Sequence, residues 1–329
     1  MSASTARPLL DNSTDARFFS GRTEDLARLE RAVGRNANAL IVGPRGAGKT
    51  SLLRMLQLRL RDQGRTVVFI DGRSVDDVRS VLRRVLERLG EVSGAPQPGW
   101  WRDEADVLDL VAQLTATAGV MTARRDRGPV VLCDELPSAE TGHTLFGRLR
   151  DDLWMTGLTW VLAVPSVWEP VVLEPPADAF FEVTVTLAPL TIKDAEALVR
   201  LRVGGSLARQ LTKVIRAGAL EPPQTPRALL QLAVAAAETS VEEAATRAGR
   251  PDPIADLPRP EAMLVAELRW TGPASASDSQ LLARLGWTRS RAVQVLRALA
   301  DKGVVAGYDV PNPKGGRPLK RYRLTEGWL

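Results

Sequence analysis

The first half of the chain alternates between short apolar runs and longer segments with helical periodicity. The apolar runs are continuous rather than alternating, which is typical of strands buried on both faces of a parallel sheet. They lie at 39–42, 66–71, 129–135, 159–166 and 180–185. Between them, apolar residues recur every three to four positions, which predicts helices. Strands that alternate with helices indicate an α/β fold with a doubly wound parallel sheet and right-handed crossovers.

From residue 190 the pattern changes to helices alone. The helical segments lie at 192–202, 206–217, 226–238 and 241–248. One of them has a clear start, because Thr225 is suited to cap a helix and Pro226 to occupy its first turn. The tract 249–260 contains four prolines and little hydrophobic patterning, so it is predicted to be a linker.

The last quarter has a third pattern. Three helices are predicted at 261–269, 277–285 and 289–302, followed by two strands at 304–310 and 320–324 around a glycine- and proline-rich tip. Three helices and a hairpin in this order predict a winged helix-turn-helix. The third helix is expected to place one apolar face in the core. Its members are Ala292, Val293, Leu296, Leu299 and Ala300.

These patterns divide the chain into four predicted parts. A polar, unpatterned lead-in at 1–16 is expected to be flexible, and the α/β core follows at 17–188. A helical lid is predicted at 189–250 and the winged helix-turn-helix at 251–329. An aromatic turn at 18–19 precedes the first core helix; it is interpreted either as a cover for a nucleotide base or as a hydrophobic staple for that helix.

Composition and charge narrow the function. The 329 residues are 44% hydrophobic and 25% charged, with one cysteine (Cys133) and one histidine (His143). No apolar run is long enough to cross a bilayer and no signal-peptide pattern opens the chain, so a cytoplasmic protein without a membrane partner is expected. The net charge is +5, and residues 256–329 carry 12 Lys and Arg against 7 Asp and Glu. Since the rest is balanced, the basic excess indicates that the C-terminal module meets a polyanion.

The segment 43–50 carries the clearest chemical motif. It fits the phosphate-binding pattern G-x-x-x-x-G-K-[ST] and stands between a predicted strand and a predicted helix. Its glycines allow backbone N–H groups to face a polyphosphate, Lys49 supplies a cation, and Thr50 offers a hydroxyl to Mg²⁺. The predicted nucleotide-binding residues are Gly43, Pro44, Arg45, Gly46, Ala47, Gly48, Lys49, Thr50, Ser51, Phe19 and Arg22.

A second motif ends the apolar run at 129–135. The final residues Asp134 and Glu135 would be held rigidly at the carboxyl edge of the sheet. Asp134, with Thr50, is predicted to hold Mg²⁺, and Glu135 to polarise the attacking water. Such a strand is a weak signal alone, but the phosphate-binding loop upstream makes it a strong one.

Together these motifs resemble the AAA+ and STAND group of P-loop ATPases, in particular the origin-recognition initiator type with a C-terminal winged helix. The resemblance extends over 18–329. It includes two short sequence motifs, one at 19–22 before the first core helix and one at 187–190 where the helical lid begins. It implies ATP as ligand and substrate, and it places Arg227 on the γ-phosphate, beside the catalytic residues Glu135 and Lys49. Ser166, at the end of the fourth predicted strand, occupies the position where this group keeps a second polar residue that senses the nucleotide (sensor 1); this match is less specific than that of Arg227. One feature departs from the pattern: residues 165–182 contain no Arg or Lys that could serve as an arginine finger, which favours slow hydrolysis.

Two functions remain open. The first is an ATP-controlled protein that binds double-stranded DNA through the winged helix. The predicted contacts are Ser290, Arg291, Gln294, Arg297, Lys314, Arg317, Lys320 and Arg321. The second is a signalling ATPase whose winged helix docks on its own lid or on a protein partner, including another copy of the chain. The basic wing favours DNA, since a protein-docking module does not need it.

Overall fold

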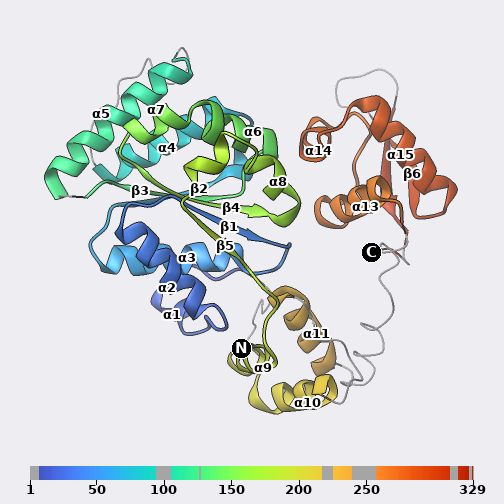
Figure 1. Cartoon of the computed structure of the whole chain (residues 1–329). Coiled ribbons are helices and arrows are strands. Elements are labelled where there is room, and N and C mark those ends of the chain that lie inside the picture. The colour runs from blue at the N-terminus through green and yellow to red at the C-terminus, as the bar shows by residue number, and fades with distance from the viewer. Residues whose placement is uncertain are drawn as a thin grey trace. The chain divides into compact units, whose positions relative to one another are not determined.

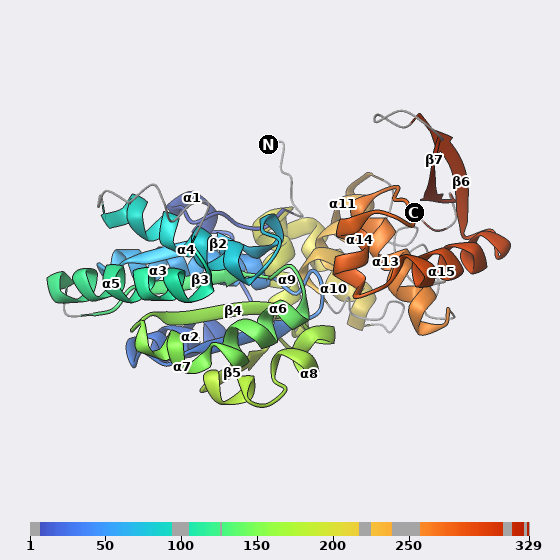
Figure 2. The ribbon, with the colours of Figure 1, turned by 90° about the horizontal axis from the view of Figure 1, so that it is seen from above.

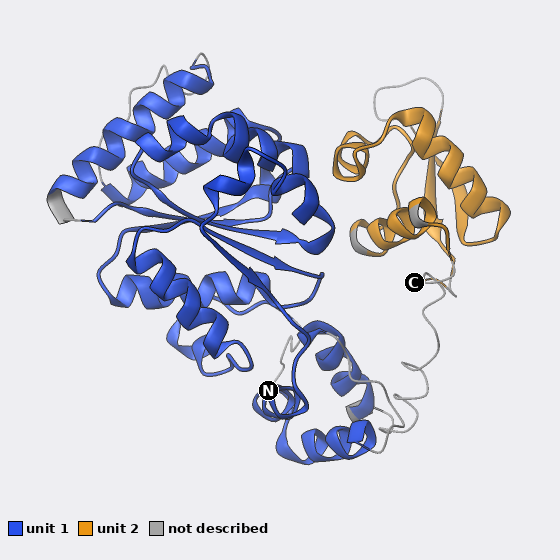
Figure 3. Cartoon of the chain, in the orientation of Figure 1, with its two compact units in different colours: residues 1–249 blue, residues 250–329 orange. Residues whose placement is uncertain are grey.

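The computed structural model describes residues 7–93, 105–125, 127–216, 225–238, 257–311, 318–325 and 328. The chain divides into two compact units, 1–249 and 250–329 (Figure 3). The linker predicted at 249–260 lies mostly outside the described residues, as do the predicted helix at 241–248 and the hairpin tip with Lys314 and Arg317.

Unit 1 contains the predicted parallel sheet. The strands are β1 (Ala39–Gly43), β2 (Val67–Asp71), β3 (Val130–Asp134), β4 (Thr159–Pro165) and β5 (Val183–Thr186). All pair in parallel, in the order β2-β3-β4-β1-β5. β1 lies beside β4, and the connection that leaves β1 runs towards β2 whereas the connection that leaves β4 runs towards β5. The phosphate-binding loop after β1 therefore lies at a switch point of the sheet. In open α/β sheets, ligands bind at such a point, beyond the carboxyl ends of the strands.

Helices cover both faces of the sheet, because strand side chains alternate between two cores. Odd residues of β1, such as Ile41, face α2 (Thr23–Gly34) and α3 (Lys49–Asp62). Even residues, such as Leu40, face α4 (Val78–Ser93) and α5 (Val107–Arg125) on the opposite side (Figure 1). The second core also contains the ring of Phe146, which packs against the rings of Trp160 and Phe180.

The helix predicted after β3 is interrupted. The segment folds as α6 (Ala139–His143), a π-helical turn η3 (Thr144–Arg148) and α7 (Arg150–Met155). After β4 come the short turns η4 (Ser166–Trp168), α8 (Glu169–Val172) and η5 (Ala177–Phe180). The strand predicted from residue 180 therefore begins only at Val183. The buried rings of Phe180 and Phe181 pack into the core instead.

The expectation of a flexible lead-in is wrong for residues 7–16. This segment contains α1 (Ser13–Ala16), and Leu9 is buried in the core beneath α3. Asp15 is buried as well and accepts a hydrogen bond of 2.6 Å from Arg7. The backbone N–H of Leu9 donates to Ser51 Oγ at 3.1 Å, so the lead-in packs directly on the helix that follows the phosphate-binding loop.

Among the described residues, three helices at the end of unit 1 pack together as a bundle (Figure 2). They are α9 (Ile192–Arg202), α10 (Gly205–Arg216) and α11 (Pro226–Glu238), which share a hydrophobic cluster. Thr225 caps α11 as predicted, since its Oγ1 accepts from Ala228 N at 3.2 Å.

The described part of unit 2 contains three helices and two paired strands. These are α13 (Arg259–Thr271), α14 (Ser279–Leu285), α15 (Arg289–Asp301), β6 (Val305–Val310) and β7 (Leu319–Leu324), with the strands antiparallel. The buried face of α15 differs from the prediction at one position: Val293 is 38% exposed and Val295 is buried in its place. The helix is rotated so that Ala292, Val295, Leu296 and Leu299 point inward, and this turns Val293 towards solvent.

Among the described helices, none combines the length and the apolar character that crossing a bilayer requires.

Candidate functional site

The phosphate-binding loop connects the end of β1 with the start of α3. Gly46 and Gly48 have φ angles of +83° and +98°, which explains why glycine is needed at both. Lys49 is buried, and its Nζ donates to the carbonyls of Gly43 at 2.8 Å and Pro44 at 3.2 Å. Burial lowers the pKa of Lys49, and the charges of Glu135 and Asp134 oppose this shift. The ammonium group thus lies at the loop, in the place the motif predicts.

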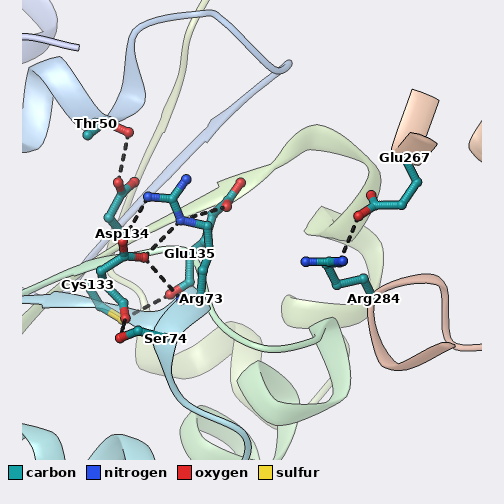
Figure 4. Close-up of polar contacts among 9 residues, drawn as sticks. Thr50, Arg73, Ser74, Cys133, Asp134, Glu135, Glu267 and Arg284 are labelled. Carbon is teal, nitrogen blue, oxygen red and sulfur yellow. Dashed lines mark hydrogen bonds and ion pairs between the residues drawn. The ribbon is translucent and has the colours of Figure 1, made fainter. Parts of the chain in front are cut away.

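The predicted metal-binding pair also meets. Thr50 Oγ1 donates to Asp134 Oδ2 at 2.8 Å, which joins the start of α3 to the end of β3 (Figure 4). Burial raises the pKa of Asp134 to about 6, against the effect of the hydrogen bond from Thr50. A hydroxyl and a carboxylate are oxygen ligands of the kind Mg²⁺ prefers. No group of three or more His, Cys, Asp or Glu side chains suited to a metal occurs among the described residues, so phosphate oxygens and waters would complete the coordination.

The backbone of Glu135 is held in an unusual conformation. Its φ is +64°, a left-handed value that a non-glycine residue adopts at a cost. Its N–H donates to Ala163 O at 2.9 Å, and Cys133 Sγ donates to its carbonyl at 3.1 Å. From β2, Gly72 approaches so closely that a Cβ there would lie 2.2 Å from the same carbonyl oxygen. Glu135 is therefore fixed by contacts from three neighbouring segments.

An arginine that the sequence patterns did not single out lies beside this carboxylate. Arg73 follows β2 and forms a two-point interaction with Asp71 at 2.8 and 2.9 Å. Its Nε also lies 3.7 Å from Glu135 Oε2 (Figure 4). The hydrogen bonds that Arg73 donates to Asp71 raise the pKa of Arg73, and they lower the pKa of Asp71 although burial opposes this shift. Only the adjacency of β2 and β3 brings these residues together, so no local motif could have revealed the pair.

The start of α11 touches the phosphate-binding loop. The N–H of Arg227 donates to Gly46 O at 3.3 Å. A Cβ on Gly46 would lie 2.9 Å from the Cβ of Arg227 and 3.1 Å from Thr225 Oγ1. The structure thus brings the predicted γ-phosphate sensor next to the loop. Ser166, the predicted sensor 1 residue, is exposed and directly follows Pro165 at the end of β4. Pro165 pairs with Gly43, the first residue of the phosphate-binding motif.

Phe19 and Arg22 lie on the entry to α2. Phe19 packs partly buried against the core beneath α3. Arg22 is buried, and its Nη2 donates to Ala188 O at 2.6 Å and to Ala47 O at 3.5 Å. Burial lowers the pKa of Arg22, and Asp25 at 3.5 Å opposes the shift. Arg22 therefore connects the phosphate-binding loop with the segment that leads to the helical bundle.

Three features define a P-loop ATPase fold of the AAA+ kind: a phosphate-binding loop after β1, an acidic end of β3 and the strand order β2-β3-β4-β1-β5. The family model described as "AAA ATPase domain" matches residues 19–161. This segment of the chain therefore carries the sequence pattern of an AAA-type ATPase domain.

Individual proteins are more distant. The phosphonates import ATP-binding protein PhnC 2 of Oceanobacillus iheyensis is 33% identical over 78 residues, which are 24% of this chain and 30% of that protein. The chain thus matches less than a third of the length of this curated relative.

Two solved structures share the fold over most of both chains. The Aeropyrum pernix ORC2 protein, with ADPNP and ADP, aligns with a TM-score of 0.57 at 16% identity, covering 94% of this chain and 90% of that one. Cdc6p of Pyrobaculum aerophilum aligns with a TM-score of 0.51 at 17% identity, covering 95% and 94%.

In unit 2, the described residues among the predicted DNA contacts lie on two elements. On α15, the side chains of Ser290, Arg291, Gln294 and Arg297 are all exposed. On β7, Lys320 is exposed, whereas Arg321 is half-buried and donates to the carbonyl of Pro273.

The basic residues of unit 2 fall into two groups. Arg284 and Lys302 form internal ion pairs with Glu267 at 2.7 Å and with Glu261 at 2.6 Å, which tie α14 and α15 to α13. Arg291 and Arg297 take part in none of the ion pairs formed among the described residues. Charge on the exposed face of α15 is therefore not neutralised within unit 2 in the described part of the chain.

Proposed function

We propose that this protein is an ATP-controlled DNA-binding protein that hydrolyses ATP slowly, and that unit 2 is a winged helix-turn-helix that binds double-stranded DNA. The observation that carries the proposal is the two-sided character of α15. One side is buried, while the other exposes Arg291, Gln294 and Arg297. Arginine and glutamine are the side chains that most often make paired hydrogen bonds to guanine and adenine in the major groove.

In the ATPase domain, each predicted residue has a defined task. Lys49 places its charge on the β- and γ-phosphates, and Glu135 orients and polarises the attacking water. Thr50 and Asp134 would hold Mg²⁺, which neutralises charge on the phosphates when bound. Arg227 approaches the γ-phosphate from α11. Because the start of α11 touches the loop, the state of the nucleotide can alter the position of the bundle.

Slow turnover follows from the residues around β4. An arginine finger is worth about 10³–10⁵ in rate in GTPases, and residues 165–182 contain no Arg or Lys. Arg150, which precedes β4, is engaged with Asp151 at 3.0 Å and with Pro176 O at 3.2 Å. The isolated protein therefore acts as a switch, with a second copy of the chain or another partner as the source of any faster hydrolysis.

The experiment is a titration of duplex DNA against salt, with and without ATP, for the wild type and four variants of the full chain, together with thermal unfolding and ATP hydrolysis of each. Lys49→Ala should lose the thermal stabilisation by ATP, whereas Glu135→Gln should keep it and lose hydrolysis. Replacing Lys314, Arg317, Lys320 and Arg321 by Ala should flatten the salt dependence by about 0.9 log unit per lost phosphate contact. Arg291→Ala should change preference among sequences by about 1–3 kcal/mol.

Two results would overturn parts of the proposal. If the wild type does not bind duplex DNA above background at low salt, with or without ATP, the DNA assignment is wrong and a protein-docking role for unit 2 replaces it. If ATP raises the unfolding temperature of Lys49→Ala as much as that of the wild type, the assignment of the phosphate-binding loop is wrong.

A further inference from the structure

The helix α10 of unit 1 carries an exposed basic stripe. We propose that Arg209, Lys213 and Arg216, here called the α10 stripe, bind the phosphate backbone of duplex DNA, as a second DNA contact in addition to unit 2. The proposal rests on the proposed DNA-binding function. Net charge does not reveal this stripe, because positive and negative charges balance over the residues before 256.

The two sides of α10 differ completely. Ala208, Leu211, Thr212 and Ile215 are buried in the bundle with α9 and α11. The three members of the stripe are all exposed and stand at positions i, i+4 and i+7, on one face of the helix. Seven residues of helix span about 10 Å, which is the axial length of about three phosphates of one DNA strand.

The positive charge of the stripe is not neutralised locally. Residues 205–216 contain no acidic residue. The stripe residues also take part in none of the ion pairs formed within the described part of the chain. The contrast with α2 is clear, because that helix exposes Arg28 and Arg31 but interleaves them with Glu24, Asp25 and Glu30.

The packing of α10 indicates that the stripe binds a nucleic acid rather than a membrane surface. A helix that lies on a membrane surface must insert a free apolar face, but the apolar face of α10 is buried in the bundle. No large hydrophobic residue of α10 is exposed, either. An evenly spaced row of cations without apolar neighbours fits a phosphate backbone, where contacts fix position without reading sequence.

The α10 stripe is also connected with the nucleotide site. It lies on the bundle whose helix α11 donates the Arg227 N–H to Gly46 of the phosphate-binding loop. A DNA contact here would place DNA and ATP on two sides of one small cluster of helices, whereas unit 2 is a separate compact unit.

The test measures the affinity of the full chain for a labelled duplex of mixed sequence as a function of salt, with ATP present. The stripe variant replaces Arg209, Lys213 and Arg216 by Gln. A matched variant removes the same charge from α2 by replacing Arg28, Arg31 and Arg35 by Gln. A third variant, Arg209→Lys with Arg216→Lys, keeps the charge of the stripe. Retained stabilisation by ATP shows that each variant is folded.

We expect the stripe variant to flatten the salt slope by about 2.7, so that its affinity relative to wild type changes about 40-fold between about 50 and 200 mM salt. The α2 and Lys variants should keep the wild-type slope. Equal slopes for the stripe variant and the wild type would overturn the proposal, and the stripe would then be a site for an acidic protein or a solvated surface. An equal loss in the α2 variant would also overturn it.

The two proposals can fail separately. If the wild type does not bind duplex DNA at all, the DNA-binding function itself is wrong. If the wild type binds, and replacing Arg291 on α15 weakens binding while the stripe variant does not, only the second contact is wrong.

Discussion

Replacing Gly72 by alanine tests whether close packing at the end of β2 aligns the predicted catalytic carboxylate. A Cβ at residue 72 would lie 2.2 Å from the backbone oxygen of Glu135 and 3.0 Å from Leu136 Cα, whereas Cβ atoms essentially never come closer than 3.0 Å to other heavy atoms. To restore an ordinary contact, the backbone of Glu135 must retreat by at least 0.8 Å, the difference between 3.0 and 2.2 Å. Those neighbours are backbone atoms, so no flexible side chain can give way.

A displacement of about 1 Å at a reacting group costs about 10²-fold in rate. We therefore expect Gly72→Ala to lower kcat for ATP hydrolysis by about 100-fold. ATP binding should be almost unchanged, because Lys49 and the phosphate-binding loop lie across the sheet, after β1. The assay compares kcat and KM for ATP in wild type, Gly72→Ala and Glu135→Gln, with thermal stabilisation by ATP as the measure of binding.

Gly119→Ala is the matched control, because no heavy atom lies within 4 Å of a Cβ at that position of α5. It should have wild-type kinetics. If Gly72→Ala hydrolyses ATP at the wild-type rate, then the position of Glu135 does not limit the reaction and the assigned role of this carboxylate is wrong. If Gly72→Ala loses ATP binding instead, the strand end supports the loop rather than the catalytic carboxylate.

Two further predictions concern contacts that the structure revealed. Arg73→Ala should lower kcat by up to about fivefold without weakening ATP binding, because a partly exposed ion pair such as that with Glu135 is worth at most about 1 kcal/mol; kinetics of Arg73→Lys, which keeps the charge, provide the comparison, and an unchanged kcat in Arg73→Ala would contradict the role. Asp15→Asn should destabilise unit 1 by about 1 kcal/mol at neutral pH, a value reduced because Arg7 is exposed. The hydrogen bond from Arg7 lowers the pKa of Asp15, so this stabilisation is present above the unfolded value of about 3.9 and is lost as the pH falls through the folded value. The unfolding temperatures of the two proteins should therefore converge as the pH falls below the folded pKa of Asp15. A difference independent of pH would show that the charge of Asp15 contributes nothing.

The sequence predicted the parts of the site that are encoded locally. The phosphate-binding loop is recognisable from residues 43–50 alone, because its glycines, Lys49 and Thr50 must follow one another at fixed spacing in the chain. The acidic end of β3 was predictable because the same run of residues both buries the strand and places the carboxylates at its edge. The phosphate-binding loop and the acidic end of β3 could be assigned to one site before the strand order was known, since both follow the carboxyl ends of parallel strands.

Contacts between distant segments could not be predicted in this way. Arg73 reaches Glu135 only because β2 pairs with β3, and the lead-in is ordered only because Leu9 finds a place in the core beneath α3. Asp11 likewise pairs with Arg61 at 2.7 Å, fifty residues away. The lead-in is a polar segment of about ten residues without a periodic pattern. Its contacts could not be predicted from it, because each one depends on a residue of another element.

Helix rotation was the finest detail that the pattern missed. On α15, both Val293 and Val295 are apolar, and the spacing to Leu296 and Leu299 admits either valine at the margin of the buried face. The structure buries Val295, and this choice gives the exposed face its composition, with Val293 between Ser290 and Arg297. In the proposed DNA complex, a small apolar side chain on that face is compatible with a thymine methyl group. The side that faces DNA is thus determined by how the other side packs against α13 and β6, so the core of unit 2 sets the orientation of the residues that would read the sequence.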